Sequence, residues 1–184
     1  KKFRKQMIML GLLTSIAATS WVSGLSLVGP SVLGFLVRFI TVFTIIFAVV
    51  FLKEKFNKYE AFSIAIIVAG AFVISYTGGE LAIGAIFALV SSLAFAYTQL
   101  KIKIYVKKID PITLAALRML FTVPFLFSYS AISGAIMPIS LDNMLLIIAG
   151  ALLISVVGFV LLFKAYETAD LSKVAAIGAA EPLI

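Results

Sequence analysis

The chain has 184 residues, of which 63% are hydrophobic and 12% charged, and its formal net charge is +7. Soluble domains are about 45–50% apolar and about 25% charged, so a soluble fold of this size could not cover so much apolar surface. The sequence contains neither cysteine nor histidine, which excludes disulfides, thiolate or imidazole metal sites and histidine acid–base chemistry. We therefore expect no metal and no cofactor. The lysines lie at the ends of apolar segments, which favours a topology signal over nucleic-acid binding.

Six apolar segments predict transmembrane helices, because crossing the hydrocarbon core takes about 20 apolar residues, and a seventh segment is unfinished. In chain order the segments are Met7–Leu27, Ser31–Leu52, Glu60–Tyr76, Leu81–Leu100, Pro111–Ala131, Met144–Phe163 and Ser172–Ile184. Gly29-Pro30 predicts a turn, and Asp110-Pro111 predicts an N-cap followed by proline at the first helical position. The short connections favour antiparallel neighbours, so the predicted fold is an all-α, polytopic membrane helix bundle.

The first residues are basic and precede an apolar run, a pattern also found in secretory signal peptides. A signal-peptide core is only about 7–15 residues long, whereas this run continues to Leu27, which favours a retained helix. The sequence lacks an initial methionine and ends inside an apolar run. We therefore expect a piece of a longer protein.

Basic residues occur in every second connection. They precede the first segment and return after the second, fourth and sixth segments, while the other connections carry none. Basic connections concentrate on the cytoplasmic side of membranes. We expect an integral protein of a prokaryotic cell (inner) membrane with its basic connections in the cytoplasm.

Two segments carry small residues at every fourth position, which places them on one helix face. These residues are Gly11, Ser15, Thr19 and Ser23 in the first segment and Gly84, Ala88, Ser92 and Ala96 in the fourth. Such a face favours close helix packing. The alternative is that the hydroxyls of Ser15, Thr19 and Ser23 line a narrow polar path.

Prolines lie inside two segments, at Pro124 and Pro182. Each removes one backbone hydrogen bond and can bend or break its helix, and for Pro182 the released carbonyl belongs to Gly178. Broken helices often lie at the substrate site of transporters. Pro182, Gly178 and Pro124 are therefore candidate gating positions, with a simple kink as the alternative for Pro124.

Two membrane-embedded charges, Arg38 and Glu181, are the main candidates for substrate binding. Arg38 lies about 10 Å from the outer side and Glu181 about 13 Å from the cytoplasmic side, at 1.5 Å per helical residue. In a core of about 30 Å these depths differ by several Å, so we hypothesise a common cavity. Alternatives are a snorkelling or structural Arg38 and a neutral, hydrogen-bonded Glu181.

Further polar and aromatic residues complete the candidate set. For Arg118, near the cytoplasmic end of its segment, snorkelling or contact with the carbonyls of a neighbouring helix is favoured over substrate contact. Trp21, Tyr97, Gln99 and Tyr166 are candidate cavity walls. The last three also fit an interfacial belt.

Four stretches together resemble EamA-type domains of the drug/metabolite transporter superfamily. Phe47–Phe56 (FAVVFLKEKF) resembles a helix end of the family. The family motif there is an apolar residue followed by Gly or Lys, then Glu, then Lys or Arg. Phe62–Ile74 resembles the glycine-containing helix that follows it. Asp110–Phe121 resembles the second-helix motif with its arginine, here Arg118. Phe163–Leu183 resembles the junction that ends in Glu-Pro, here Glu181-Pro182.

The resemblance implies ten helices in two inverted five-helix repeats. On that map residues 1–79 hold the last three helices of the first repeat, and residues 80–184 the first three and a half of the second. The first two and the last one and a half helices would then be missing. Arg38 departs from the family pattern, because its stretch is usually uncharged or contains proline.

These features predict a secondary active transporter, not an enzyme, that exports a small polar metabolite such as an amino acid by alternating access. A proton is one candidate coupling ion and a homodimer one candidate assembly. The alternatives are a membrane-embedded enzyme or lipid-handling protein, whose expected carboxylate cluster is missing here, and a non-transporting membrane subunit.

Overall fold

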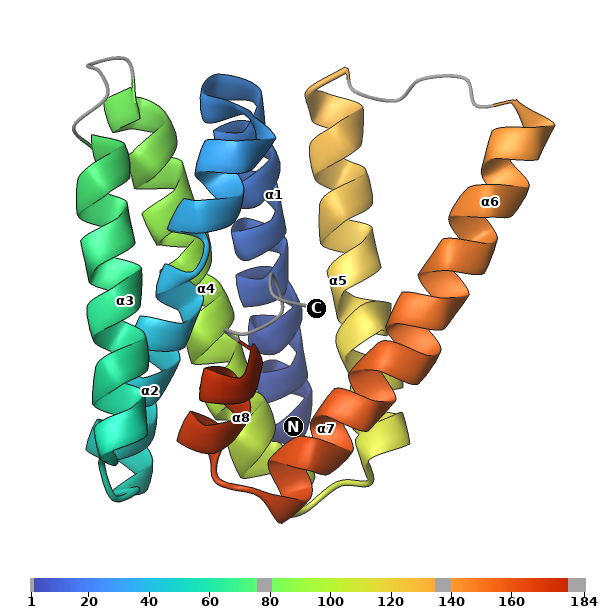
Figure 1. Ribbon diagram of the computed structural model, residues 1–184. Coiled ribbons are helices and arrows are strands. Elements are labelled where there is room, and N and C mark those ends of the chain that lie inside the picture. The colour runs from blue at the N-terminus through green and yellow to red at the C-terminus, as the bar shows by residue number, and fades with distance from the viewer. Residues whose placement is uncertain (1, 76–80, 135–139, 179–184) are drawn as a thin grey trace. The chain divides into compact units, whose positions relative to one another are not determined.

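The computed structural model describes residues 2–75, 81–134 and 140–178, and every regular element in them is a helix (Figure 1). The predicted residues Glu181 and Pro182 lie outside this described part. The elements are α1 (Lys2–Leu36), α2 (Phe39–Leu52), α3 (Lys58–Ser75), α4 (Leu81–Val106), α5 (Pro111–Ile132), α6 (Leu141–Leu152), the π-helix η1 (Leu153–Gly158), α7 (Phe159–Thr168) and α8 (Leu171–Gly178).

Three helices of the described part are long and apolar enough to cross a membrane. They span Arg4–Leu36, Ile83–Val106 and Pro111–Ile132, and two shorter apolar helices span Phe39–Leu52 and Asn143–Leu152. Large apolar side chains are exposed along α6, for example Leu146 at 72% and Leu153, in the following η1, at 66%. Side chains of this kind face lipid in a membrane protein. The prediction of an all-α membrane helix bundle is confirmed.

Local capping explains where several helices begin. Asp110 caps α5 as predicted, because its carboxylate accepts hydrogen bonds from Ile112 N (3.0 Å) and Thr113 N (3.1 Å). At the start of α3, Asn57 and Glu60 form a capping box. Asn57 Oδ1 accepts from the backbone of the first turn, while Glu60 Oε2 accepts from Asn57 N at 3.0 Å.

Two predicted helices are interrupted in the structure. Ser31–Leu52 is not one helix, because regular α-helix stops at Leu36 and resumes at Phe39. Met144–Phe163 contains the π-helical turn η1. The predicted turn at Gly29-Pro30 is a sharp kink, in which Gly29 adopts φ 75° and ψ 170°. α5 runs continuously through Pro124, so a gating role for this proline remains a prediction.

The chain forms two compact units, each described here by itself. Unit 1 comprises Lys1–Ser15 and Ile102–Thr168, and unit 2 comprises Ile16–Lys101 and Ala169–Ile184. This division follows spatial contacts and is a different one from the predicted repeats at 1–79 and 80–184. The repeat boundaries therefore remain a prediction.

In unit 1 the small-residue face of α1 packs closely on α5. A methyl group at Gly11 would lie 2.7 Å from backbone atoms of Phe121. Ser15 Oγ donates to Gly11 O (2.9 Å) and to Thr122 O (3.3 Å), so its hydroxyl is used between these two helices. Close packing is confirmed for this part of the face.

In unit 2 the second small-residue face brings α4 against the C-terminal part of α1. A methyl group at Gly84 would lie 2.1 Å from Val28 Cγ1, and Ser91 Oγ donates to Ala17 O at 2.8 Å. Ala88 is fully buried in a cluster with Leu33 and Leu36. This packing holds the chain that leads into Arg38 against α4.

Candidate functional site

The interruption between α1 and α2 centres on Arg38 and lies within unit 2. The backbone here makes tighter hydrogen bonds to the third preceding residue, from Arg38 N to Phe35 O (3.0 Å), from Ile40 N to Val37 O (2.9 Å) and from Thr41 N to Arg38 O (2.9 Å). Irregular backbone at membrane depth is tolerated only where protein or a wet cavity covers it. The interruption is therefore a place where a polar site can be built.

The Arg38 side chain reaches the end of another helix of unit 2. Its Nη1 lies 3.5 Å from Gly178 O, at the last residue of α8. Gly178 is the last residue of α8 that the structure describes, and a carbonyl oxygen is an acceptor that a guanidinium N–H can use. The guanidinium thus meets the carbonyl that the sequence singled out. Pro182, whose ring was expected to release it, lies outside the described residues.

The opposite end of α8 is held by Glu54. Its Oε1 accepts from Leu171 N (2.9 Å), and its Oε2 accepts from Ser172 N (3.0 Å) and Ser172 Oγ (2.8 Å). Lys53, the C-cap of α2, adopts the left-handed conformation (φ 57°, ψ 32°) immediately before this carboxylate. A carboxylate at a helix N-terminus is favourable to the backbone N–H groups and to the helix dipole.

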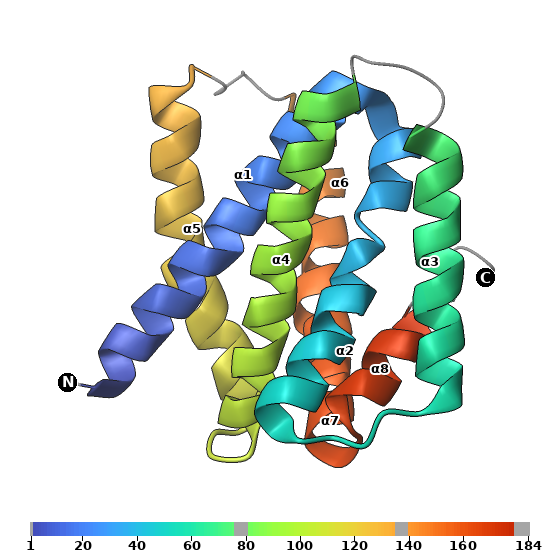
Figure 2. The ribbon, with the colours of Figure 1, turned by 90° about the vertical axis from the view of Figure 1, so that its left-hand side faces the viewer.

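These two contacts make α2 and α8 a connected pair. Residues flanking α2 hold α8 at two points, through Glu54 at its N-terminus and through Arg38 at Gly178. The two helices also pack along their length, and α3 lies beside both (Figure 2). A shift of α8 relative to α2 must therefore alter at least one of the two contacts.

No role was predicted for Glu54 from the sequence. The partners of Glu54 lie 117 and 118 residues further along the chain. The available signal was the glutamate between two lysines at a helix end, within the family-like stretch Phe47–Phe56. That pattern alone could not show which helix the carboxylate caps.

Other polar groups of unit 2 surround the interruption. Ser92 Oγ of α4 donates to Val37 O at 3.4 Å, and the fully buried Thr44 Oγ1 donates to Gln99 Oε1 at 2.9 Å. Gln99 was a predicted cavity wall, whereas Thr44 was not predicted. The Thr44–Gln99 hydrogen bond links α4 to the first half of α2, and the Ser92–Val37 hydrogen bond links α4 to the residue before Arg38.

The remaining unit 2 candidates have more ordinary surroundings. The Tyr97 ring meets the edge of Phe47 at 6.0 Å, and Lys101 Nζ lies 5.0 Å from its centroid. Trp21 is 39% exposed. Thr19, half-buried, donates to the backbone one turn earlier (3.1 Å), and Ser23 is also half-buried. A substrate contact for any of them remains a prediction.

Arg118 and Tyr166 belong to unit 1, where both are buried. The Arg118 guanidinium carbon lies 3.9 Å from the Phe159 ring centroid and 5.5 Å from that of Phe163, and within the described residues its Nε has no hydrogen-bond partner. Arg118 is only 5% exposed, so it packs on aromatic rings and does not snorkel. The Tyr166 carbonyl accepts from Lys103 Nζ at 2.5 Å.

Comparison with known proteins assigns the chain to a family. The family model of the EamA-like transporter family matches residues 1–76 and 82–184. No curated protein and no solved structure gives a match. The matched residues include the interruption at Arg38, the Glu54 connection and α8. This chain, a membrane helix bundle, therefore belongs to the EamA-like transporter family.

Proposed function

We propose that the protein is a secondary active transporter that exports a small polar metabolite, such as an amino acid, by alternating access. The observation that supports the proposal most directly is the Arg38 guanidinium at a helix interruption, facing the Gly178 carbonyl of α8. The family match supports transport itself. The distribution of basic residues supports an orientation in which the basic connections lie in the cytoplasm.

The chemistry at this point suits a substrate with both a carboxylate and an ammonium group. Arginine presents five N–H donors in a planar fork that matches a carboxylate. The Gly178 carbonyl, which Pro182 cannot satisfy with a helical hydrogen bond because proline lacks an N–H, provides an acceptor for an ammonium group. Glu181, three residues beyond Gly178, would add a full negative charge. Arg38 and Glu181 would then form the two halves of a zwitterion site.

The contacts of α8 are also compatible with movement of this helix during transport. At 3.5 Å the Arg38–Gly178 contact is at the long limit for a hydrogen bond, and a substrate carboxylate would compete with the Gly178 carbonyl for the guanidinium. The C-terminal end of α8 would then move while Glu54 keeps its N-terminal end on α2. Pro182 and the small-residue faces would permit this movement. A proton remains one candidate coupling ion, and a homodimer one candidate assembly.

The test is flux in proteoliposomes that contain the full-length protein, with and without a proton gradient. A labelled panel of amino acids, nucleosides and organic acids is compared between the wild type, Arg38→Ala, Arg38→Lys and the control Arg4→Ala. Arg4 is exposed near the start of α1. Loss of a charged hydrogen-bond donor, about 1.5–3 kcal/mol, predicts a tenfold to hundredfold fall in flux for Arg38→Ala. Arg38→Lys keeps the charge but not the planar fork and should show a smaller fall, and Arg4→Ala none.

Two results would count against the proposal. Wild-type flux in Arg38→Ala would remove Arg38 from the substrate site. If the folded wild type moved no member of the panel, the membrane-embedded enzyme, lipid-handling and non-transporting alternatives would be favoured.

A further inference from the structure

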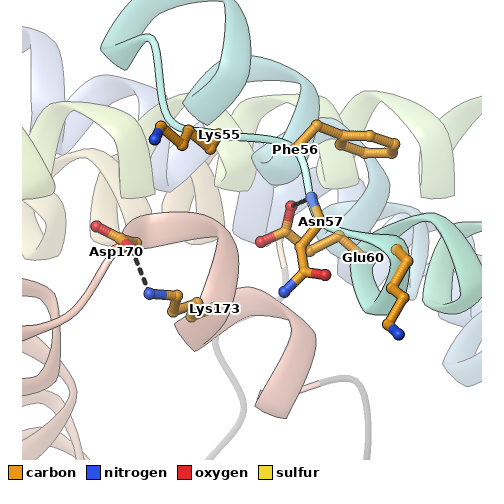
Figure 3. A pocket seen from close by; sticks show the side chains of 7 residues that line it. Lys55, Phe56, Asn57, Glu60, Asp170 and Lys173 are labelled. Carbon is orange, nitrogen blue, oxygen red and sulfur yellow. Dashed lines mark hydrogen bonds and ion pairs between the residues drawn. The ribbon is translucent and has the colours of Figure 1, made fainter.

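A polar cavity, separate from the Arg38 contact, opens in unit 2 where α3 and α8 begin. Its volume is about 690 Å³. It is lined by Lys55, Phe56 and Asn57 of the α2–α3 connection, by Lys58 and Glu60 of α3, and by Asp170 and Lys173 at the start of α8 (Figure 3). The N-termini of α3 and α8 therefore meet at one hollow, the first capped by Asn57 with Glu60 and the second by Glu54.

The carboxylates of this cavity are committed to partners within the chain. Glu60 is 3% exposed and accepts from Asn57 N at 3.0 Å in the capping box. Asp170 forms an ion pair with Lys173 at 2.7 Å. Three lysines against two carboxylates leave a net charge of +1. The exposed Lys55 and Lys58 carry the charge that these pairs do not neutralise.

The cavity also presents an amide donor. Asn57 Oδ1 is turned toward Tyr59 N (3.4 Å), which directs the amide nitrogen of Asn57 away from the helix. Figure 3 shows the Asn57 amide among the lining residues, with the Lys173 amine directed at Asp170. Lysine amines are donors only. A phosphate group, with its negative charge and several acceptor oxygens, is the complementary ligand.

The segment that lines the cavity also carries exposed aromatic rings. Phe56 is 56% exposed, and Tyr59 and Phe62 are each 67% exposed. In membrane proteins such rings gather at the level of the lipid headgroups. Basic residues near that level attract anionic lipids. A ligand with both a phosphate group and acyl chains matches the lysines and the rings together.

We propose that this cavity binds the phosphate group of an anionic phospholipid, with Lys55 and Lys58 as its main charge partners and Asn57 as a donor. The acyl chains lie beside the exposed rings of Phe56, Tyr59 and Phe62. The bound lipid joins the α2–α3 connection to the start of α8. This inference does not depend on the transported substrate.

Native mass spectrometry of the full-length protein in detergent tests the site, because no charged bilayer surface is present and only lipid held in a site is retained. Phosphatidylglycerol and phosphatidylcholine are titrated into the wild type, Lys55→Gln/Lys58→Gln and the control Lys107→Gln/Lys108→Gln. The control removes the same charge from two exposed lysines outside the cavity. A pair with retained charge, Lys55→Arg/Lys58→Arg, completes the set.

The wild type is expected to retain phosphatidylglycerol in preference to phosphatidylcholine. An exposed ion pair contributes up to about fivefold in affinity, so the glutamine pair in the cavity should weaken this binding by up to about twenty-fivefold, while the control and arginine pairs keep it. Equal losses in the cavity and control pairs, loss in the arginine pair, or no lipid preference in the wild type would overturn the site. Displacement by millimolar inorganic phosphate would overturn the lipid assignment in favour of a soluble phosphorylated ligand.

Discussion

Replacing Glu54 by glutamine tests whether this side chain holds α8 in place. The carboxylate uses one oxygen for Leu171 N and the other for Ser172 N and Ser172 Oγ. Glutamine keeps a single acceptor oxygen and places an NH₂ group where the second oxygen was. The better orientation of the amide places its oxygen toward Ser172. The NH₂ group then faces Leu171 N, so that hydrogen bond is lost and two donors face each other.

The expected cost follows from these contacts. One charge-assisted hydrogen bond is worth about 1.5–3 kcal/mol, and the charge at the helix N-terminus adds about 0.3–1 kcal/mol. Glu54 is half-exposed, so water offsets part of the loss, and we expect about 2 kcal/mol. At 1.4 kcal/mol per factor of ten, this is about a thirtyfold rise in the local opening of α8.

Hydrogen–deuterium exchange of the peptide that contains Leu171 and Ser172 measures this opening in the folded protein. Glu54→Gln should exchange these two amides about thirtyfold faster, whereas the control Glu167→Gln, which changes an exposed glutamate of α7, should leave them unchanged. Unchanged protection in Glu54→Gln would refute the assignment of Glu54 as the N-terminal anchor of α8.

Two further predictions concern unit 1. Gly11→Ala forces a methyl group to within 2.7 Å of the Phe121 backbone and should destabilise the protein by about 1–3 kcal/mol in thermal unfolding. Gly150→Ala, with nothing within 4 Å, should be neutral or stabilising, and similar melting temperatures for both would contradict the close packing of α1 on α5. A double-mutant cycle of Arg118→Met and Phe159→Leu should give a coupling energy of about 1–2 kcal/mol, because their contact at 3.9 Å is buried. Additive effects of these two substitutions would show that the ring does not stabilise the guanidinium.

The sequence predicted those features that depend on neighbouring residues. The length of the apolar runs predicted membrane helices, and the N-cap of α5 followed from Asp110-Pro111, because a cap is a contact within one turn. The order of the family-like stretches predicted the family that the comparison shows. Small residues at every fourth position predicted a close-packed face, since the helix period alone places them together.

The tertiary structure decided which distant residues meet. No proline marks the interruption at Arg38, and only the packing of unit 2 shows that its guanidinium faces Gly178, 140 residues away. The role of Glu54 depends on where α8 packs, and the buried position of Arg118 depends on the rings of α7. Local patterns encode helix, cap and turn within a few residues. Contacts between segments depend on how whole helices pack, and a single sequence does not record that packing residue by residue.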